Sequence, residues 1–156
     1  MIDDVLGSQD LLRFRDAYDP VQMASVLGTF FAEAHPASLP YVAAIGSVFY
    51  AAPDGEPAPR ERLAAVDRER CLVALLAARG STVGLAIHIY LALMQGVSAG
   101  EVADILFLTG VYTGIDNFAE ALKVEIAVLE QMRLLVARGE TTPGAVVATL
   151  EATFRR

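Results

Sequence analysis

Two apolar stretches that meet at a glycine constrain the fold of this chain more than any other feature. The first runs from Glu69 to Arg79, the second runs from Ser81 through His88, and Gly80 lies between them. Gly80 can adopt the positive φ that ends many helices, and Ser81 is a suitable N-cap for the helix that follows. The sequence therefore predicts two antiparallel helices joined at Gly80.

An acid and an imidazole lie at similar heights in this hairpin. With a rise of about 1.5 Å per residue, Glu69 is roughly 16 Å from Gly80 and His88 is roughly 12 Å from it. The offset is about one turn, roughly 4–5 Å, which two facing side chains can span. A carboxylate beside an imidazole is a common acid–base arrangement, and it is also what an ordinary buried ion pair looks like. The spacing alone leaves both interpretations open, with the structural one as the default.

A family resemblance follows from the same residues. The order Glu69, nineteen positions, His88, then an apolar helix that ends in Gly96–Glu101 resembles the carboxymuconolactone decarboxylase family, which also holds the alkylhydroperoxidase D proteins. Val111–Ile115 is similar to the tyrosine–glycine break before that family's last long helix. The resemblance covers about 63–132. It implies an all-α, alkylhydroperoxidase D-like helical bundle that assembles as a homotrimer or homohexamer.

One departure from the family pattern selects the branch. The redox members place a CxxC pair four and seven residues before the histidine, and here Gly84 and Ser81 stand at those positions. The only cysteine, Cys71, lies in an apolar run and is expected to be a small core residue. Without a resolving partner it cannot run a dithiol cycle. We therefore expect no peroxidase activity and place the chain with the branches that lack the pair, such as the decarboxylases.

The resemblance implies a cofactor-free decarboxylase or isomerase that acts on a small carboxylated lactone or a related acid. His88 would deliver a proton, and Glu69 would orient it. Ser81, at a helix start where backbone N–H groups point outward, would bind an anion, and Tyr112 is a further candidate for substrate binding. No metal is expected, because Glu69 and His88 give two ligands where a catalytic zinc site normally uses three. The alternative is a non-catalytic helical oligomer that binds a small apolar ligand or a partner.

Four arginines surround the start of the helix that carries the acid, which Asp67 is expected to cap. They are Arg60, Arg62, Arg68 and Arg70. One reading is an exposed basic end balanced by neighbouring acids. The other is that one guanidinium pairs with a substrate carboxylate, for which its planar fork is well suited. The sequence does not choose among the four, and Arg70 is taken as the candidate.

Composition and net charge narrow the kinds of partner that the chain can have. With 54% hydrophobic and only 20% charged residues, the chain has more apolar surface than a small monomer easily hides, so we expect a homo-oligomer. A net charge of −7 provides no basic stripe for nucleic acid. No apolar stretch is long enough and free enough of polar residues to predict a membrane span. One cysteine and an acidic N-terminus favour a cytoplasmic protein.

The chain is expected to form one structural domain with four parts. These are an N-terminal helical extension over 1–52, a proline-rich linker over 53–60, a family-like core over 61–140 and a C-terminal helix over 141–156.

Three signals predict individual helix starts. Asp19–Pro20 is a cap followed by proline, Ser98 opens a capping box before a helix over 101–112, and Thr142 precedes Pro143. A further helix is expected from Ser38 through Tyr50.

Overall fold

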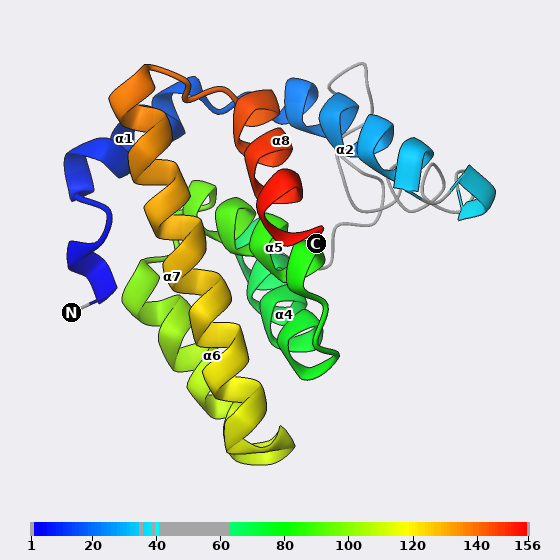
Figure 1. Ribbon diagram of the computed structural model, residues 1–156, viewed down its shortest axis with the longest axis vertical. Coiled ribbons are helices and arrows are strands. Elements are labelled where there is room, and N and C mark those ends of the chain that lie inside the picture. The colour runs from blue at the N-terminus through cyan, green and yellow to red at the C-terminus, as the bar shows by residue number, and fades with distance from the viewer. Residues whose placement is uncertain (1, 35, 39, 41–62, 156) are drawn as a thin grey trace.

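The computed structural model describes residues 2–34, 36–38, 40 and 63–155. The expected linker over 53–60, and nearly all of the expected helix from Ser38 through Tyr50, lie outside this part of the chain. The described residues form helices and no strand, which confirms the all-α prediction (Figure 1). The elements are η1 Ile2–Asp4, α1 Ser8–Ala17, α2 Pro20–Ala34, η2 Pro36–Ser38, α4 Ala65–Ala78, α5 Thr82–Met94, α6 Ala99–Thr113, α7 Ile115–Arg138 and α8 Pro143–Phe154.

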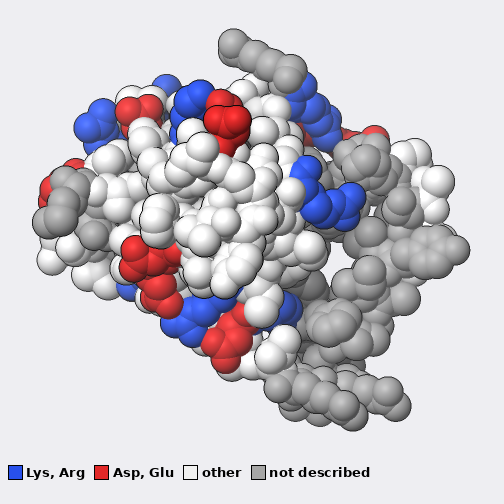
Figure 2. Space-filling model, turned by 90° about the horizontal axis from the view of Figure 1, so that it is seen from below, with Lys and Arg blue, Asp and Glu red and all other residues white. Residues whose placement is uncertain are grey.

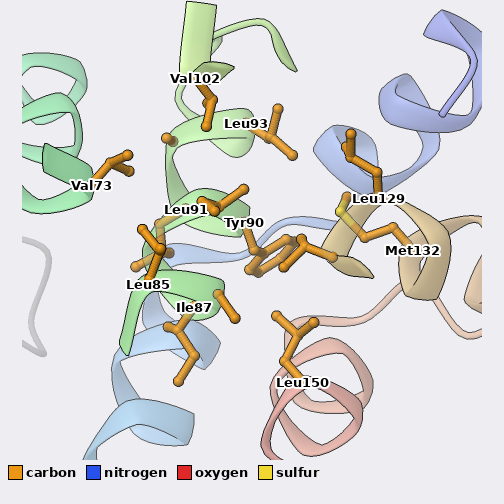
Figure 3. Packing of buried hydrophobic residues seen from close by; sticks show 14 of the residues in the cluster. Val73, Leu85, Ile87, Tyr90, Leu91, Leu93, Val102, Leu129, Met132 and Leu150 are labelled. Carbon is orange, nitrogen blue, oxygen red and sulfur yellow. The ribbon is translucent and has the colours of Figure 1, made fainter. Parts of the chain in front are cut away.

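Helix α5 is the buried centre of the molecule. Its run from Leu85 to Met94 is buried at every position except His88. Helices α4, α7 and α8 pack around it, and Figure 3 shows Tyr90 lying among Leu129 and Met132 of α7 and Leu150 of α8. A helix that is apolar on nearly every face must be covered on nearly every side. His88 is therefore the one position of this run at which the central helix is not fully covered.

The α4–α5 hairpin has the predicted turn. Gly80 has a φ of 66°, in the left-handed region that a side chain disfavours. Ser81 occupies the N-cap position of α5, but its side chain accepts no capping hydrogen bond. The expected cap at Asp67 was wrong: the N-cap is Ala64, three residues earlier, and α4 begins at Ala65, so that Asp67 lies in its first turn. There its negative charge interacts favourably with the positive end of the helix dipole, but its side chain does not cap the helix.

The other start signals are confirmed. The Asp19 carboxylate accepts the backbone N–H of Val21 at 2.8 Å, before α2. The Ser98 hydroxyl accepts the backbone N–H of Glu101 at 3.1 Å, and α6 extends one or two residues beyond the predicted range at each end. Thr142 caps α8 in the same way. These helix starts are local, so a few neighbouring residues suffice to predict them.

The N-terminal segment packs into the common core. Phe14 of α1 is fully buried, and Leu6 and Met23 are buried beside the same hydrophobic cluster. The Arg15 Nε–H donates to the Leu93 carbonyl at 2.9 Å, near the C-terminal end of α5. That carbonyl is among those a helix end leaves without an intrahelical partner. The segment therefore closes one end of the central helix.

Cys71 departs from its prediction as a core residue. It is exposed on α4, whose buried face is formed by Glu69, Val73 and Ala77. Those three are spaced by four residues, whereas Cys71 is two residues from Glu69 and hence about 200° around the helix. The apolar run around Cys71 therefore does not indicate which face of the helix is buried.

Helices α6 and α7 approach closely at Gly110. A Cβ placed there would lie 2.4 Å from the Cβ of Phe118, a distance that forces neighbouring atoms to move. The turn between the two helices is at Gly114, where φ is 113°. None of the helices in the described residues is long and apolar enough to cross a membrane.

Candidate active site

Glu69 and His88 meet as the hairpin geometry predicts. The Nδ1 atom of His88, in the middle of α5, lies 2.7 Å from Oε2 of Glu69, in the first half of α4. Glu69 is only 1% exposed, so its carboxylate lies in the protein interior. An ionised carboxylate can only accept hydrogen bonds, and Nδ1 of the imidazole therefore donates its N–H to Glu69. This contact fixes both the tautomer and the orientation of the ring.

The second oxygen of Glu69 is held by Arg68. The Arg68 Nε–H donates to Oε1 at 3.3 Å, and the Arg68 side chain is 14% exposed. The buried negative charge is thereby compensated by a guanidinium on one side and hydrogen-bonded to an imidazole on the other, as a buried carboxylate requires. Arg68 thus belongs to the site, although the sequence ranked it no higher than its three neighbours.

Arg70, the arginine chosen from the sequence, points elsewhere. Its Nη1 donates to Asp67 at 2.7 Å, and its Nη2 donates to Glu101 of α6 at 2.6 Å. These hydrogen bonds, Asp67 first and then Glu101, raise the pKa of the exposed Arg70 guanidinium. Arg70 therefore links α4 to the start of α6. Arg70 differs from Arg68 in that it pairs with Glu101 of α6. The residues around position 70 do not predict that partner.

Ser81 and Tyr112 are not brought to the pair. Ser81 lies at the start of α5, two helical turns or about 10 Å before His88. Tyr112 lies near the end of α6 and is 84% exposed. Within the described part of the chain, neither side chain has a polar contact with Glu69 or His88.

Tyr18, in the N-terminal segment, lies near the carboxylate of Glu69, and the sequence alone does not predict this. Its ring packs edge-on against Tyr90 of α5, with the ring centroids 6.3 Å apart. Burial, and after it the negative charge of Glu69, raises the pKa of the Tyr18 phenol. The phenol is therefore neutral at ordinary pH. Tyr18 lies outside the range of the family resemblance, and no motif around it signals a role.

The Nε2 atom of His88 is the part of this cluster that could take part in a reaction. The side chain is 16% exposed, and its Nε2 atom has no partner among the described residues. With Nδ1 occupied by the carboxylate, Nε2 is the ring atom that can accept or deliver a proton. The arrangement can thus perform proton transfer at Nε2 of a side chain that is partly exposed.

Other sites in the described residues offer less. No group of three or more His, Cys, Asp or Glu side chains there is placed to hold a metal ion. A shallow hollow of about 500 Å³ lies between α7 and α8, away from the pair, and carries no titratable side chain in its lining of Gln131, Ala148, Thr149, Ala152 and Thr153. This hollow therefore offers no group for proton transfer, whereas the Glu69–His88 pair does.

Comparison with known proteins agrees with the resemblance seen in the sequence. A model of the carboxymuconolactone decarboxylase family matches residues 48–125, which is half of the chain and includes both Glu69 and His88. The match begins earlier than the resemblance over 63–132 and ends before it. No curated protein and no solved structure shows significant similarity to the chain. On the family match, the chain belongs to the carboxymuconolactone decarboxylase family.

Proposed function

We propose that this protein is a cofactor-free decarboxylase or isomerase that acts on a small carboxylated lactone or a related acid. The observation that carries the proposal is that the two nitrogens of the His88 ring have different surroundings. Nδ1 is held by a buried carboxylate at 2.7 Å, and Nε2 has no described partner on a ring that is partly exposed. A histidine that served packing alone would gain nothing from an oriented, open nitrogen.

Each group in the cluster has a role in this reaction. When a carboxylate is lost from a carbon next to a conjugated carbonyl, the carbon–carboxylate bond breaks and carbon dioxide leaves. The electron pair of that bond passes into the carbonyl and forms an enolate. The protonated His88 then delivers the Nε2 proton to the carbon, and the neutral ring takes a new proton from water. Glu69 orients the ring through its contact with Nδ1, while Arg68 donates a hydrogen bond to the other oxygen of the same carboxylate.

An isomerisation would use the same atoms. The neutral Nε2 would remove a proton from the carbon next to the carbonyl and return it at a conjugated position. No electron leaves the substrate in either reaction, which is why neither needs the missing CxxC pair. The oxidation of a thiol pair, in contrast, is closed to a chain with one cysteine.

We also propose that the chain assembles as a homotrimer or homohexamer, with the apolar face of the α6–α7 hairpin as its contact surface. We call this surface the apolar face and define it by Phe107, Leu108, Val111, Tyr112 and Ile115, which are 54–84% exposed. Seen from the end of this hairpin, the molecule presents a broad area without charged residues (Figure 2). Large exposed apolar surfaces are characteristic of interaction sites. The same face favours the alternative function, a non-catalytic oligomer that binds a ligand or partner.

Turnover decides between the two functions. A panel of carboxylated lactones and β-keto acids should be tested for release of carbon dioxide and for changes in ultraviolet absorbance. With any compound that reacts, His88→Gln should lower kcat/KM at least about a hundredfold, because a positioned proton donor contributes about 10²–10⁴-fold. His35→Gln, which changes the only other histidine, is the matched control. Normal turnover by His88→Gln would remove His88 from the mechanism, and a panel without any reaction favours the non-catalytic oligomer.

A further inference from the structure

Arg68 and His88 bind the two oxygens of one buried carboxylate. The Arg68 Nε–H donates to Oε1 of Glu69 at 3.3 Å, and Nδ1 of His88 donates to Oε2 at 2.7 Å. The Glu69 side chain is only 2% exposed, whereas the side chains of Arg68 and His88 are 14% and 16% exposed. A molecule that reaches this cluster from solvent would therefore meet the guanidinium and the imidazole, with the carboxylate behind them.

The neighbouring arginine on α4 is directed to another helix. Arg68 and Arg70 are two residues apart, which places them about 200° from each other around the helix axis. Arg70 donates to Asp67 at 2.7 Å and to Glu101 of α6 at 2.6 Å. Arg68 instead shares its acceptor, Glu69, with a histidine of α5. Of these two arginines, Arg68 is therefore the one that lies beside the candidate site.

The guanidinium of Arg68 is suited to bind an anion. Its Nε–H contacts Glu69, and the two terminal nitrogens carry the remaining N–H groups in the same plane. Such a planar fork matches a carboxylate through two parallel hydrogen bonds, which the charges strengthen. When His88 carries the proton that it is to deliver, Glu69, Arg68 and His88 together have one positive charge. The cluster therefore favours an anionic ligand over a neutral one.

We propose that Arg68 is a substrate-binding residue whose guanidinium pairs with a carboxylate of the substrate, while Nε2 of His88 faces the carbon that exchanges a proton. This inference rests on the proposed function, because it assumes that the ligand occupies the Glu69–His88 site. It predicts that the site binds acids more tightly than their neutral esters, and that Arg68 causes this preference.

A comparison of an acid with its ester on the full chain tests this role. Levulinate carries a carboxylate and a ketone, and methyl levulinate lacks only the charge. The affinity for each is measured from the shifts of the His88 ring signals in NMR titrations. Wild type should bind levulinate at least about tenfold more tightly than the ester, as a hydrogen bond between charged groups predicts. In Arg68→Gln this preference should disappear, because only the acid loses a contact.

Two further variants serve as controls. Arg70→Gln removes the same charge two positions along α4, and it should leave the preference for the acid unchanged. Arg68→Lys keeps a positive charge beside Glu69 but lacks the planar fork, so it should retain only part of the preference. Arg68→Lys also takes the place of Arg68→Gln should that variant fold poorly.

Three results would overturn the role of Arg68. The first is a preference for the acid that is unchanged in folded Arg68→Gln, or in Arg68→Lys if only that variant folds. The second is equal weakening of acid and ester, since Arg68 would then act only through Glu69. The third is a failure of levulinate to shift the His88 signals of wild type. The proposed function is judged separately, by turnover of the compound panel and its loss in His88→Gln.

Discussion

The two helical hairpins of this protein, α4–α5 and α6–α7, differ in which side chains they bury and which they expose. Both turn at a glycine with positive φ, Gly80 in the first and Gly114 in the second. The α4–α5 hairpin buries a charged carboxylate, which is costly, and compensates it with Arg68 and His88. The α6–α7 hairpin exposes large apolar side chains, which is also unfavourable for a monomer.

This difference suggests that the α4–α5 hairpin serves the candidate site and that the α6–α7 hairpin serves assembly. A buried ion cluster contributes little net stability compared with a well-packed apolar core, so its presence at the open edge of His88 fits a functional site. An exposed apolar face gains stability only when a partner covers it. Changes in the α4–α5 hairpin should therefore affect the site and leave the assembly intact, and changes in the α6–α7 hairpin should disrupt the assembly and leave the site intact.

The largest effect is expected from a charge on the apolar face. Leu108 is 60% exposed, and in Leu108→Asp a carboxylate would be buried in every copy of the subunit contact. Light scattering at micromolar concentration should give an oligomer for wild type and a monomer for the variant. Leu12→Asp, at an apolar position of α1 that is 46% exposed, is the control and should leave the oligomer intact. A monomeric wild type, or an oligomeric Leu108→Asp, would separate the apolar face from assembly.

A smaller effect is expected from removal of the Glu69 carboxylate. Glu69→Ala leaves the Arg68 and His88 donors without their acceptor, which should lower the free energy of unfolding by about 2–3 kcal/mol. Urea unfolding monitored by circular dichroism measures this loss. Glu120→Ala removes an exposed carboxylate whose partner is Lys123, and it should change stability by less than about 1 kcal/mol. Equal losses in the two variants would mean that Glu69 does not tie α4 to α5.

The smallest effect concerns the buried phenol of Tyr90. Its hydroxyl has no hydrogen-bond partner among the described residues, so Tyr90→Phe should stabilise the fold by about 1 kcal/mol. Burial, and secondarily Tyr18, raises the pKa of Tyr90 above the ordinary value of 10.0. The folded state then holds this proton more tightly than the unfolded state, and stability falls as pH rises above about 10.

Unfolding measured between pH 8 and 11 should therefore show a decline in wild type that is shallower in Tyr90→Phe. Tyr112→Phe makes the same change on the surface, where the ring is 84% exposed, and should follow wild type. A decline of the same steepness in Tyr90→Phe and wild type would mean that Tyr90 does not ionise with a raised pKa.

The sequence predicts those parts of the molecule that depend on one or two elements. The Gly80 turn and the Glu69–His88 contact follow from helical rise and the length of two adjacent helices. The distinction between Arg68 and Arg70 does not, because it depends on Glu101 of a third helix. Tyr18 could not be found either, since α1 must first dock on α5 before the charge of Glu69 can act on the phenol. The exposure of Cys71 was missed because an apolar run does not reveal which face a neighbouring helix covers.

The protonation pattern of the His88 ring tests most directly whether the buried carboxylate prepares Nε2 for proton transfer. Nitrogen NMR of the neutral ring distinguishes a proton on Nδ1 from one on Nε2, and His35→Gln leaves His88 as the only histidine to be observed. We expect the proton on Nδ1, which donates to Glu69, and an unprotonated Nε2. Glu69→Leu should return the ring to the Nε2–H form that free histidine prefers in water. A wild-type ring that carries its proton on Nε2 would contradict the proposed site.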